Sequence, residues 1–210
     1  MPTTANMEKV NGIAISGAAA PTDRHILLGT QTASSSATLS FSGINSHRSD
    51  VLRSSFDVLE FRFDNMHPAT DGADFQFQVN AAGQTGFNEV MTTTAFQVYH
   101  NESDTDTILN YHDGKDQAQG TAYQTLASYN IGNDADQSVS GILRLYAPSS
   151  TTYVKHFTSD GNGSYQTEYS ISLSLAGYIN VTAAIDEISF KFSSGNIDAG
   201  QIKMYGIAKA

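Results

Sequence analysis

The sequence predicts an all-β protein: an antiparallel, jelly-roll-like β-sandwich preceded by an extended N-terminal arm. Apolar and polar residues alternate with a period of two, which places successive side chains on opposite faces of a strand. No segment has a comparable amphipathic-helix pattern, and turn residues recur every 8–15 residues or so. The clearest alternating runs are Thr38–Ser42, Leu59–Phe63, Phe75–Asn80, Ser170–Leu175 and Ile188–Phe192.

Strands are expected, in chain order, at residues 37–44, 56–65, 73–80, 93–100, 105–111, 121–130, 139–147, 151–158, 165–175, 185–193 and 200–208. Turns are expected between them, because Asp-Gly and Asn-Gly pairs supply the positive φ angles that tight connections need. These turns are His67–Gly72, Ala82-Gly83, Asp113-Gly114, Asp160–Gly163 and Ser194–Asn196. The stretch 115–130 also has the composition of a short helix. In the last strand, Ile202, Met204 and Gly206 share one face.

Composition limits the class of protein. The 210 residues include 21 Asp and Glu against 11 Lys and Arg, a formal net charge of −10 that opposes non-specific binding to nucleic acid. Cysteine is absent, which excludes disulfides and thiolate metal sites. No apolar run is long enough for a membrane span, and no secretory signal pattern is present. We expect no nucleic-acid partner and no membrane partner.

Residues 1–36 differ in composition from residues 37–210, which form the predicted sandwich domain. Small residues dominate the first segment, and a short strand is expected at 25–31. Such a segment buries too little apolar surface to fold alone. We expect it to anchor the protein to another subunit or to the side of its own domain. The candidate anchoring residues are Lys9, Val10, Asn11, Gly12, Ile13, Ile15, Ile26, Leu27 and Leu28.

Neither a metal site nor a catalytic site is predicted. The acidic residues Glu102, Asp104, Asp106, Asp113 and Asp116 lack the glycine and the closing glutamate of a calcium loop. The six histidines lack zinc-site spacing. No nucleophile elbow, P-loop or dinucleotide fingerprint occurs. The sequence therefore predicts a protein that is not an enzyme and has no cofactor.

The ten tyrosines are the best candidates for a contact surface. Each has a rigid apolar face and a polar tip, and sugar-binding sites use such rings as stacking platforms. Packing at the edges of the sandwich is the alternative role. The candidate ligand contacts are Tyr99, Tyr111, Tyr123 and Tyr165.

Several segments resemble a family of tailed-phage virion proteins common in marine and cyanobacterial phages. They are Phe56–Asn80, Tyr153–Phe157, Ala176–Asn180 and Ser193–Ile207. The pentapeptide Lys9–Ile13 also resembles short elements of phage fibre and appendage proteins. The resemblance covers most of residues 37–210. It implies a structural or fibre-like protein, and it brings no catalytic motif.

The sequence and the resemblance together suggest a non-enzymatic virion structural protein, displayed on the particle as capsid decoration or as part of a tail fibre. Its expected location is the virion, assembled in the host cytoplasm. Its expected partners are other capsid or tail proteins and further copies of itself, with a trimer favoured. The alternative is an adsorption module that binds a host-surface glycan. A glycan-cleaving enzyme is a third option.

Overall fold

The computed structural model describes residues 8–10, 13–15, 25–44 and 56–208. Every regular element in these ranges is a β-strand, so the all-β prediction is confirmed, and none of these residues belongs to a helix that could cross a membrane. The strands are β1 (Glu8–Val10), β2 (Ile13–Ile15), β3 (His25–Thr32), β4 (Leu39–Ser42), β5 (Phe56–Pro68), β6 (Phe75–Ala81), β7 (Met91–Asn101), β8 (Thr107–Tyr111), β9 (Gln124–Thr125), β10 (Val139–Tyr146), β11 (Lys155–Tyr165), β12 (Tyr169–Ile179), β13 (Ile185–Phe192) and β14 (Ile197–Ala208).

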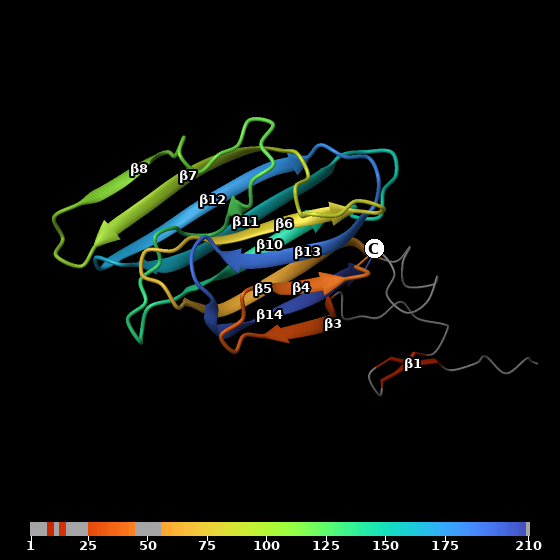
Figure 1. The fold of residues 1–210 in the computed structure, drawn as a ribbon, viewed down its shortest axis with the longest axis horizontal. Coiled ribbons are helices and arrows are strands. Elements are labelled where there is room, and N and C mark those ends of the chain that lie inside the picture. Colours follow the sequence, from red (N-terminus) through yellow and green to blue (C-terminus); the bar gives the residue numbers. More distant parts are fainter. Residues whose placement is uncertain (1–7, 11–12, 16–24, 45–55, 209–210) are drawn as a thin grey trace, which may run out of the picture.

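Two antiparallel sheets pack face to face, which confirms the β-sandwich (Figure 1). The larger sheet has eight strands in the order β3-β14-β5-β10-β11-β12-β7-β8, and the smaller has four in the order β4-β13-β6-β9. A separate hairpin pairs β1 with β2. The larger sheet is wider, and β7 and β8 extend past the smaller sheet at the left of Figure 1. The jelly-roll connectivity stays a prediction.

Phenylalanines fill the space between the sheets. Phe61 of the larger sheet contacts Phe190 of the smaller one with ring centroids 5.6 Å apart, and Phe77 meets Phe157 edge to face at 5.1 Å. All four side chains are buried. Edge-to-face and tilted contacts of this kind add to the stabilisation from apolar burial. The alternating residues that predicted strands therefore form the core.

The β8–β10 connection, residues 112–138, contributes β9 to the smaller sheet and contacts the larger sheet, because the Ala127 carbonyl accepts a hydrogen bond from the Leu173 amide of β12. Asp74, which is buried, holds this connection at three points. Its carboxylate accepts hydrogen bonds from Lys115 Nζ at 2.5 Å, Thr125 Oγ1 at 3.1 Å and the Asn130 amide at 2.8 Å. Only β9 is regular within the predicted strand 121–130, and the alternative helix is absent from this described stretch.

The predicted turn at Asp160–Gly163 is wrong, because these residues lie inside β11. The strand bends away from β12 here, and the Leu173 amide donates instead to the Ala127 carbonyl at 2.8 Å. A Cβ atom on Gly161 would lie 2.6 Å from the Ala127 Cβ and 2.9 Å from the Gly141 Cα. Glycine is required here for close packing of three backbones rather than for a turn.

The strand expected at 25–31 is present as β3, and it pairs with β14 at the edge of the larger sheet. Leu28 packs against the core. Residues 25–36, placed in the arm by composition, therefore contribute an edge strand to the sandwich. The alternation of apolar and polar residues is weak in this segment, because β3 is half-buried or exposed along its whole length.

Candidate functional site

Four tyrosines meet in a cavity of about 230 Å³ beside the exposed edge of the larger sheet. Tyr99 lies on β7, Tyr165 ends β11, and Tyr169 begins β12. The strand register brings them together, because Tyr165 pairs with Tyr169, and Ile171 on the same face pairs with Tyr99. The other lining residues are Tyr129 from the β8–β10 connection, Asp106 and Thr167. We call this cavity the tyrosine hollow.

The rings of the tyrosine hollow stand at steep angles to one another. Tyr99 and Tyr169 have centroids 5.4 Å apart and planes at 84°, and Tyr165 and Tyr169 are 5.6 Å apart at 71°. Tyr129 meets Tyr165 at 6.1 Å and 81°. All four side chains are half-buried, so each keeps some surface open to solvent. The rings therefore form a corner of aromatic faces and edges.

Hydrogen bonds hold most of these rings by their hydroxyl groups. The Tyr129 hydroxyl donates to the Gln97 side-chain oxygen, and the Tyr169 hydroxyl donates to the Asp106 carboxylate at 3.2 Å. Burial raises the pKa of Tyr129 to about 12, with the neighbouring tyrosines and Asp74 adding to the rise. Burial and the bond to Asp106 also raise the pKa of Tyr169. Both phenols are therefore neutral at physiological pH.

The position of Asp106 is set by the buried side chain of Asn101 at the end of β7. The Asn101 side-chain oxygen accepts hydrogen bonds from the amides of Thr105 and Asp106, both at 3.0 Å. Its amide nitrogen donates to the hydroxyls of Ser103 and Thr105, both at 2.8 Å. The turn before β8 is thus ordered by one side chain, and it presents the Asp106 carboxylate to the tyrosine rings.

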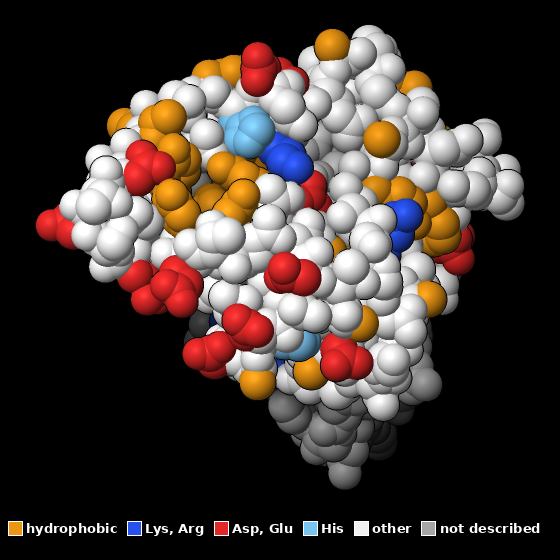
Figure 2. Space-filling model, turned by 60° about the vertical axis from the view of Figure 1, so that its left-hand side comes forward, with side chains coloured by type: hydrophobic (Ala, Val, Ile, Leu, Met, Phe, Trp, Pro, Cys, Tyr) orange, Lys and Arg blue, Asp and Glu red, His pale blue; other side chains and the backbone are white. Residues whose placement is uncertain are grey.

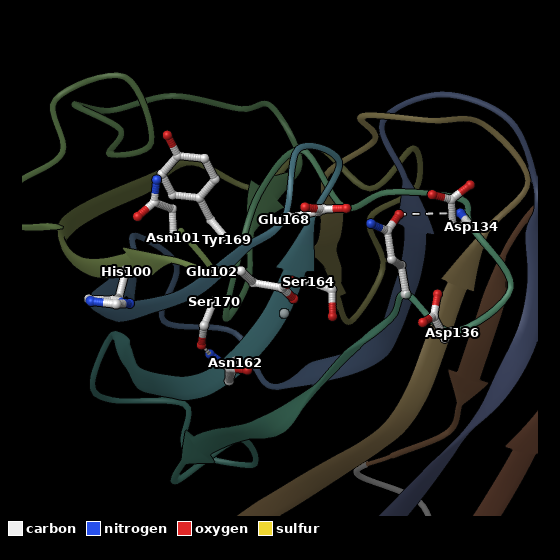
Figure 3. Close-up of a pocket in the computed structure, with 12 residues that line it drawn as sticks. His100, Asn101, Glu102, Asp134, Asp136, Asn162, Ser164, Glu168, Tyr169 and Ser170 are labelled. Atoms are coloured by element: carbon white, nitrogen blue, oxygen red, sulfur yellow. Dashed lines mark hydrogen bonds between the residues drawn. The ribbon is translucent and has the colours of Figure 1, made fainter. Parts of the chain in front are cut away.

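A second cavity, of about 430 Å³, is lined by His100 and Ser170, whose side chains lie on the opposite face of the larger sheet from the rings of Tyr99 and Tyr169 (Figure 3). We call it the acidic hollow. Glu102 and Glu168 reach it from the turns at the ends of β7 and β12, and Asp134 and Asp136 reach it from the segment before β10. Carboxylates and polar groups make up most of its wall, so it favours cations and hydroxyl-rich groups over anions.

The tyrosine hollow lies on the side of the molecule that Figure 2 turns forward. There, hydrophobic side chains surround a hollow, with a histidine and a cationic side chain next to it and acidic side chains around. The neighbours of Tyr129 are the cation Lys115, whose Nζ lies 5.2 Å from the ring centroid, and His112, whose ring centroid is 4.8 Å away. Lys115 is paired with Asp74, and burial together with Lys115 lowers the pKa of His112.

Of the four tyrosines predicted as ligand contacts, the structure brings Tyr99 and Tyr165 together. Tyr111 pairs with Phe96 on the opposite face of the sheet and donates to Asp116. Tyr123 lies under the ammonium group of Lys191, 4.5 Å from it. Tyr129 and Tyr169 were not singled out from the sequence. A turn between Tyr165 and Tyr169 would have indicated that these two residues face each other across a hairpin. The expected strand 165–175 placed both residues in one continuous strand instead.

The candidate anchoring residues fall into two groups. Lys9, Val10, Ile13 and Ile15 belong to the β1–β2 hairpin, in which Val10 pairs with Ile13. Asn11 and Gly12 lie outside the described residues. Ile26, Leu27 and Leu28 belong to β3, where Leu27 is exposed.

Two buried charges elsewhere have complete sets of partners. Glu60, on the outer face of the larger sheet, accepts hydrogen bonds from Arg62 Nε at 2.7 Å and Arg144 Nε at 2.8 Å. Burial raises the pKa of Glu60, but the two arginines outweigh it and hold the pKa below its usual value. Lys155 Nζ donates to the carbonyls of Tyr153, Val181 and Thr182 at 2.8–3.3 Å, and burial lowers its pKa. Both arrangements fit a structural role.

The acidic residues weighed as a calcium site are dispersed among other contacts. Asp104 pairs with His100 at 3.0 Å, Asp106 with Tyr169, and Asp116 with Tyr111. Within the described ranges, no three His, Asp or Glu side chains lie close enough together to hold a metal ion.

No protein-family model matches this chain, and neither a curated protein nor a solved structure is found to be similar to it. Function is therefore inferred from the tyrosine hollow, the N-terminal segment and the resemblance described above.

Proposed function

We propose that this protein is a non-enzymatic structural protein displayed on the surface of a phage particle, as capsid decoration or as part of a tail fibre or appendage. Its N-terminal segment attaches it to other virion proteins. Its sandwich faces outward as a stable, acidic body, and several copies assemble together.

One observation supports this proposal most directly: β3, which follows the N-terminal segment in the chain, and the tyrosine hollow lie toward opposite edges of the larger sheet. The chain enters the sheet at β3, and the hollow lies beside β7 and β8. With strands about 4.8 Å apart, eight strands separate the two edges by roughly 34 Å. A particle bound through the β3 side would leave the hollow free to meet a ligand.

A deletion tests the role of the N-terminal segment. Removing residues 1–24 leaves β3 and the rest of the sandwich in place. We expect the truncated protein to unfold at the same temperature as the full chain but to be lost from purified phage particles, as measured by mass spectrometry of particle proteins. Incorporation of the truncated protein at the full-length level would contradict the proposal, as would absence of the full chain from the particle.

The tyrosine hollow favours a second candidate function, adsorption to a host-surface glycan. Tyrosine rings with a nearby carboxylate can stack on a sugar and accept its hydroxyl hydrogen bonds. A glycan array with the full chain tests this. Binding that Tyr99→Leu abolishes and Tyr153→Leu retains would support the function, because Tyr153 is 72% exposed and does not line the hollow. An array without any bound glycan would count against it.

A further inference from the structure

The shape of the tyrosine hollow favours a compact, rounded ligand group over a flat sugar ring. A sugar ring stacks best on a broad, open aromatic face, whereas the rings here meet at 71–84° and form a corner. A corner of aromatic faces touches a compact, rounded group on several sides at once. The cavity of about 230 Å³ is also below the roughly 300–1,000 Å³ of sites for larger ligands, so it suits one small headgroup.

The charge around the tyrosine hollow favours a cationic ligand. Asp106 contributes a carboxylate to its wall. The nearest cation, Lys115, is neutralised by Asp74 at 2.5 Å. Aromatic faces attract cations through the negative potential of their π-systems, and alkylated ammonium groups bind well from water because they are weakly hydrated. The protein already shows this attraction, since the Lys115 ammonium lies over the Tyr129 ring.

We propose that the tyrosine hollow binds an alkylated ammonium group, such as the trimethylammonium of a choline-containing ligand. The rings of Tyr99, Tyr165 and Tyr169 surround the methyl groups, and Asp106 neutralises the charge. This inference keeps the ligand-binding role of the tyrosine hollow but assigns it a ligand class other than a stacked glycan, and it does not depend on display on a phage particle.

The site needs little rearrangement to bind. Asn101 fixes the Asp106 turn through hydrogen bonds to two backbone amides, and Tyr169 is held by Asp106 itself. One carboxylate has about four acceptor positions, so the bond from Tyr169 leaves capacity for a ligand cation. Preorganisation of this kind lowers the entropic cost of binding.

The experiment compares choline with 3,3-dimethyl-1-butanol, its neutral isostere, by isothermal titration calorimetry on the full chain at low salt. The two probes have the same shape and differ in charge. We expect choline to bind at least about tenfold more tightly, because cation–π attraction at several rings and one carboxylate acts only on the cation. Added salt should weaken choline binding, since it screens Asp106.

Substitutions test whether choline binds in the tyrosine hollow. Asp106→Asn should weaken choline binding about tenfold and leave the isostere unchanged. Tyr99→Leu should abolish choline binding, whereas Tyr99→Phe, which keeps the ring, and Tyr153→Leu, outside the hollow, should retain it. Asp106 is exposed, so Asp106→Asn tests the inference even if Tyr99→Leu fails to fold.

Equal affinity for choline and its isostere would overturn the inference, and so would the absence of choline binding. Absence of choline binding together with glycan binding that depends on Tyr99 would leave the glycan function in place. Absence of both would remove the ligand-binding function of the hollow.

Discussion

At the residue scale, the buried Glu60 carboxylate makes stability depend on pH. Its pKa is held below the usual value of 4.5 by Arg62 and Arg144, so in the acid range the unfolded chain binds more protons than the folded one. Stability from this group is therefore present above pH 4.5 and is lost as the pH falls below it.

We expect Glu60→Gln to lower the free energy of unfolding at neutral pH by about 2 kcal/mol, because charge-assisted hydrogen bonds to a buried carboxylate are lost. We also expect the variant to lose less stability than the wild type between about pH 6 and pH 3. Urea denaturation at a series of pH values measures both effects. Asp64→Asn is the matched control: Asp64 is exposed and 3.4 Å from Lys203, and its removal should change little. Identical pH profiles for wild type and Glu60→Gln would contradict the prediction.

Lys155 gives a second prediction at this scale. Its ammonium satisfies three backbone carbonyls on two segments, 153 and 181–182. Lys155→Met leaves those carbonyls without a donor, and we expect a loss of about 2 kcal/mol by chemical denaturation. Lys203→Met, in the exposed pair, should cost less than about 0.5 kcal/mol. Equal effects of the two substitutions would show that the buried ammonium does not hold these segments.

At the scale of elements, a substitution at Gly161 tests whether residues 160–163 form a continuous strand or a turn. In the structure, a side chain at this position would collide with Ala127 and Gly141. We expect Gly161→Ala to destabilise the fold by about 3 kcal/mol through overpacking, measured by urea denaturation. Gly29→Ala in β3 is the control, because the nearest atom to its added Cβ is 3.5 Å away, an ordinary contact. If both variants were equally stable, residues 160–163 would not be packed as a strand.

The strands also show how much of the fold could be predicted from the sequence. Alternation of apolar and polar residues located β5, β6, β12 and β13. The two faces differ in burial along β12, whereas in β6 the polar Gln78 and Asn80 are buried as well. The sequence pattern misplaced β11, because glycine beside Asp and Asn signals a turn locally, whereas here three backbones meet too closely for a side chain. That requirement arises from residues 127, 140 and 141, which are distant in the chain, and no local sequence pattern reveals it.

The candidate site was predictable in residue type and only partly in residue identity. Tyr99 and Tyr165 share a cavity because of the β12–β7 and β11–β12 registers. Tyr129 joins them through the β8–β10 connection, whose path depends on the buried contacts of Asp74. Asp106 reaches the hollow through the turn that Asn101 orders. Pairing registers and irregular connections are properties of the whole fold, so the sequence pattern could not locate them.

At the scale of the whole molecule, β3 decides where the sandwich begins. Deleting residues 1–24 should leave the melting temperature unchanged. Deleting residues 1–32 should lower it markedly, because it removes the partner of β14 and exposes the edge of the larger sheet. Thermal unfolding followed by circular dichroism measures both. A stable protein after the longer deletion would mean that the sandwich domain does begin near residue 37.

We propose that the two edges of the larger sheet serve different tasks, with attachment at the β3 side and ligand binding at the β7–β8 side. Cryo-electron microscopy of the native phage particle tests this most directly. We expect density for the sandwich on the particle surface, with β3 toward the particle and the tyrosine hollow open to solvent. A hollow buried against a neighbouring subunit, or a particle that lacks the chain, would contradict it.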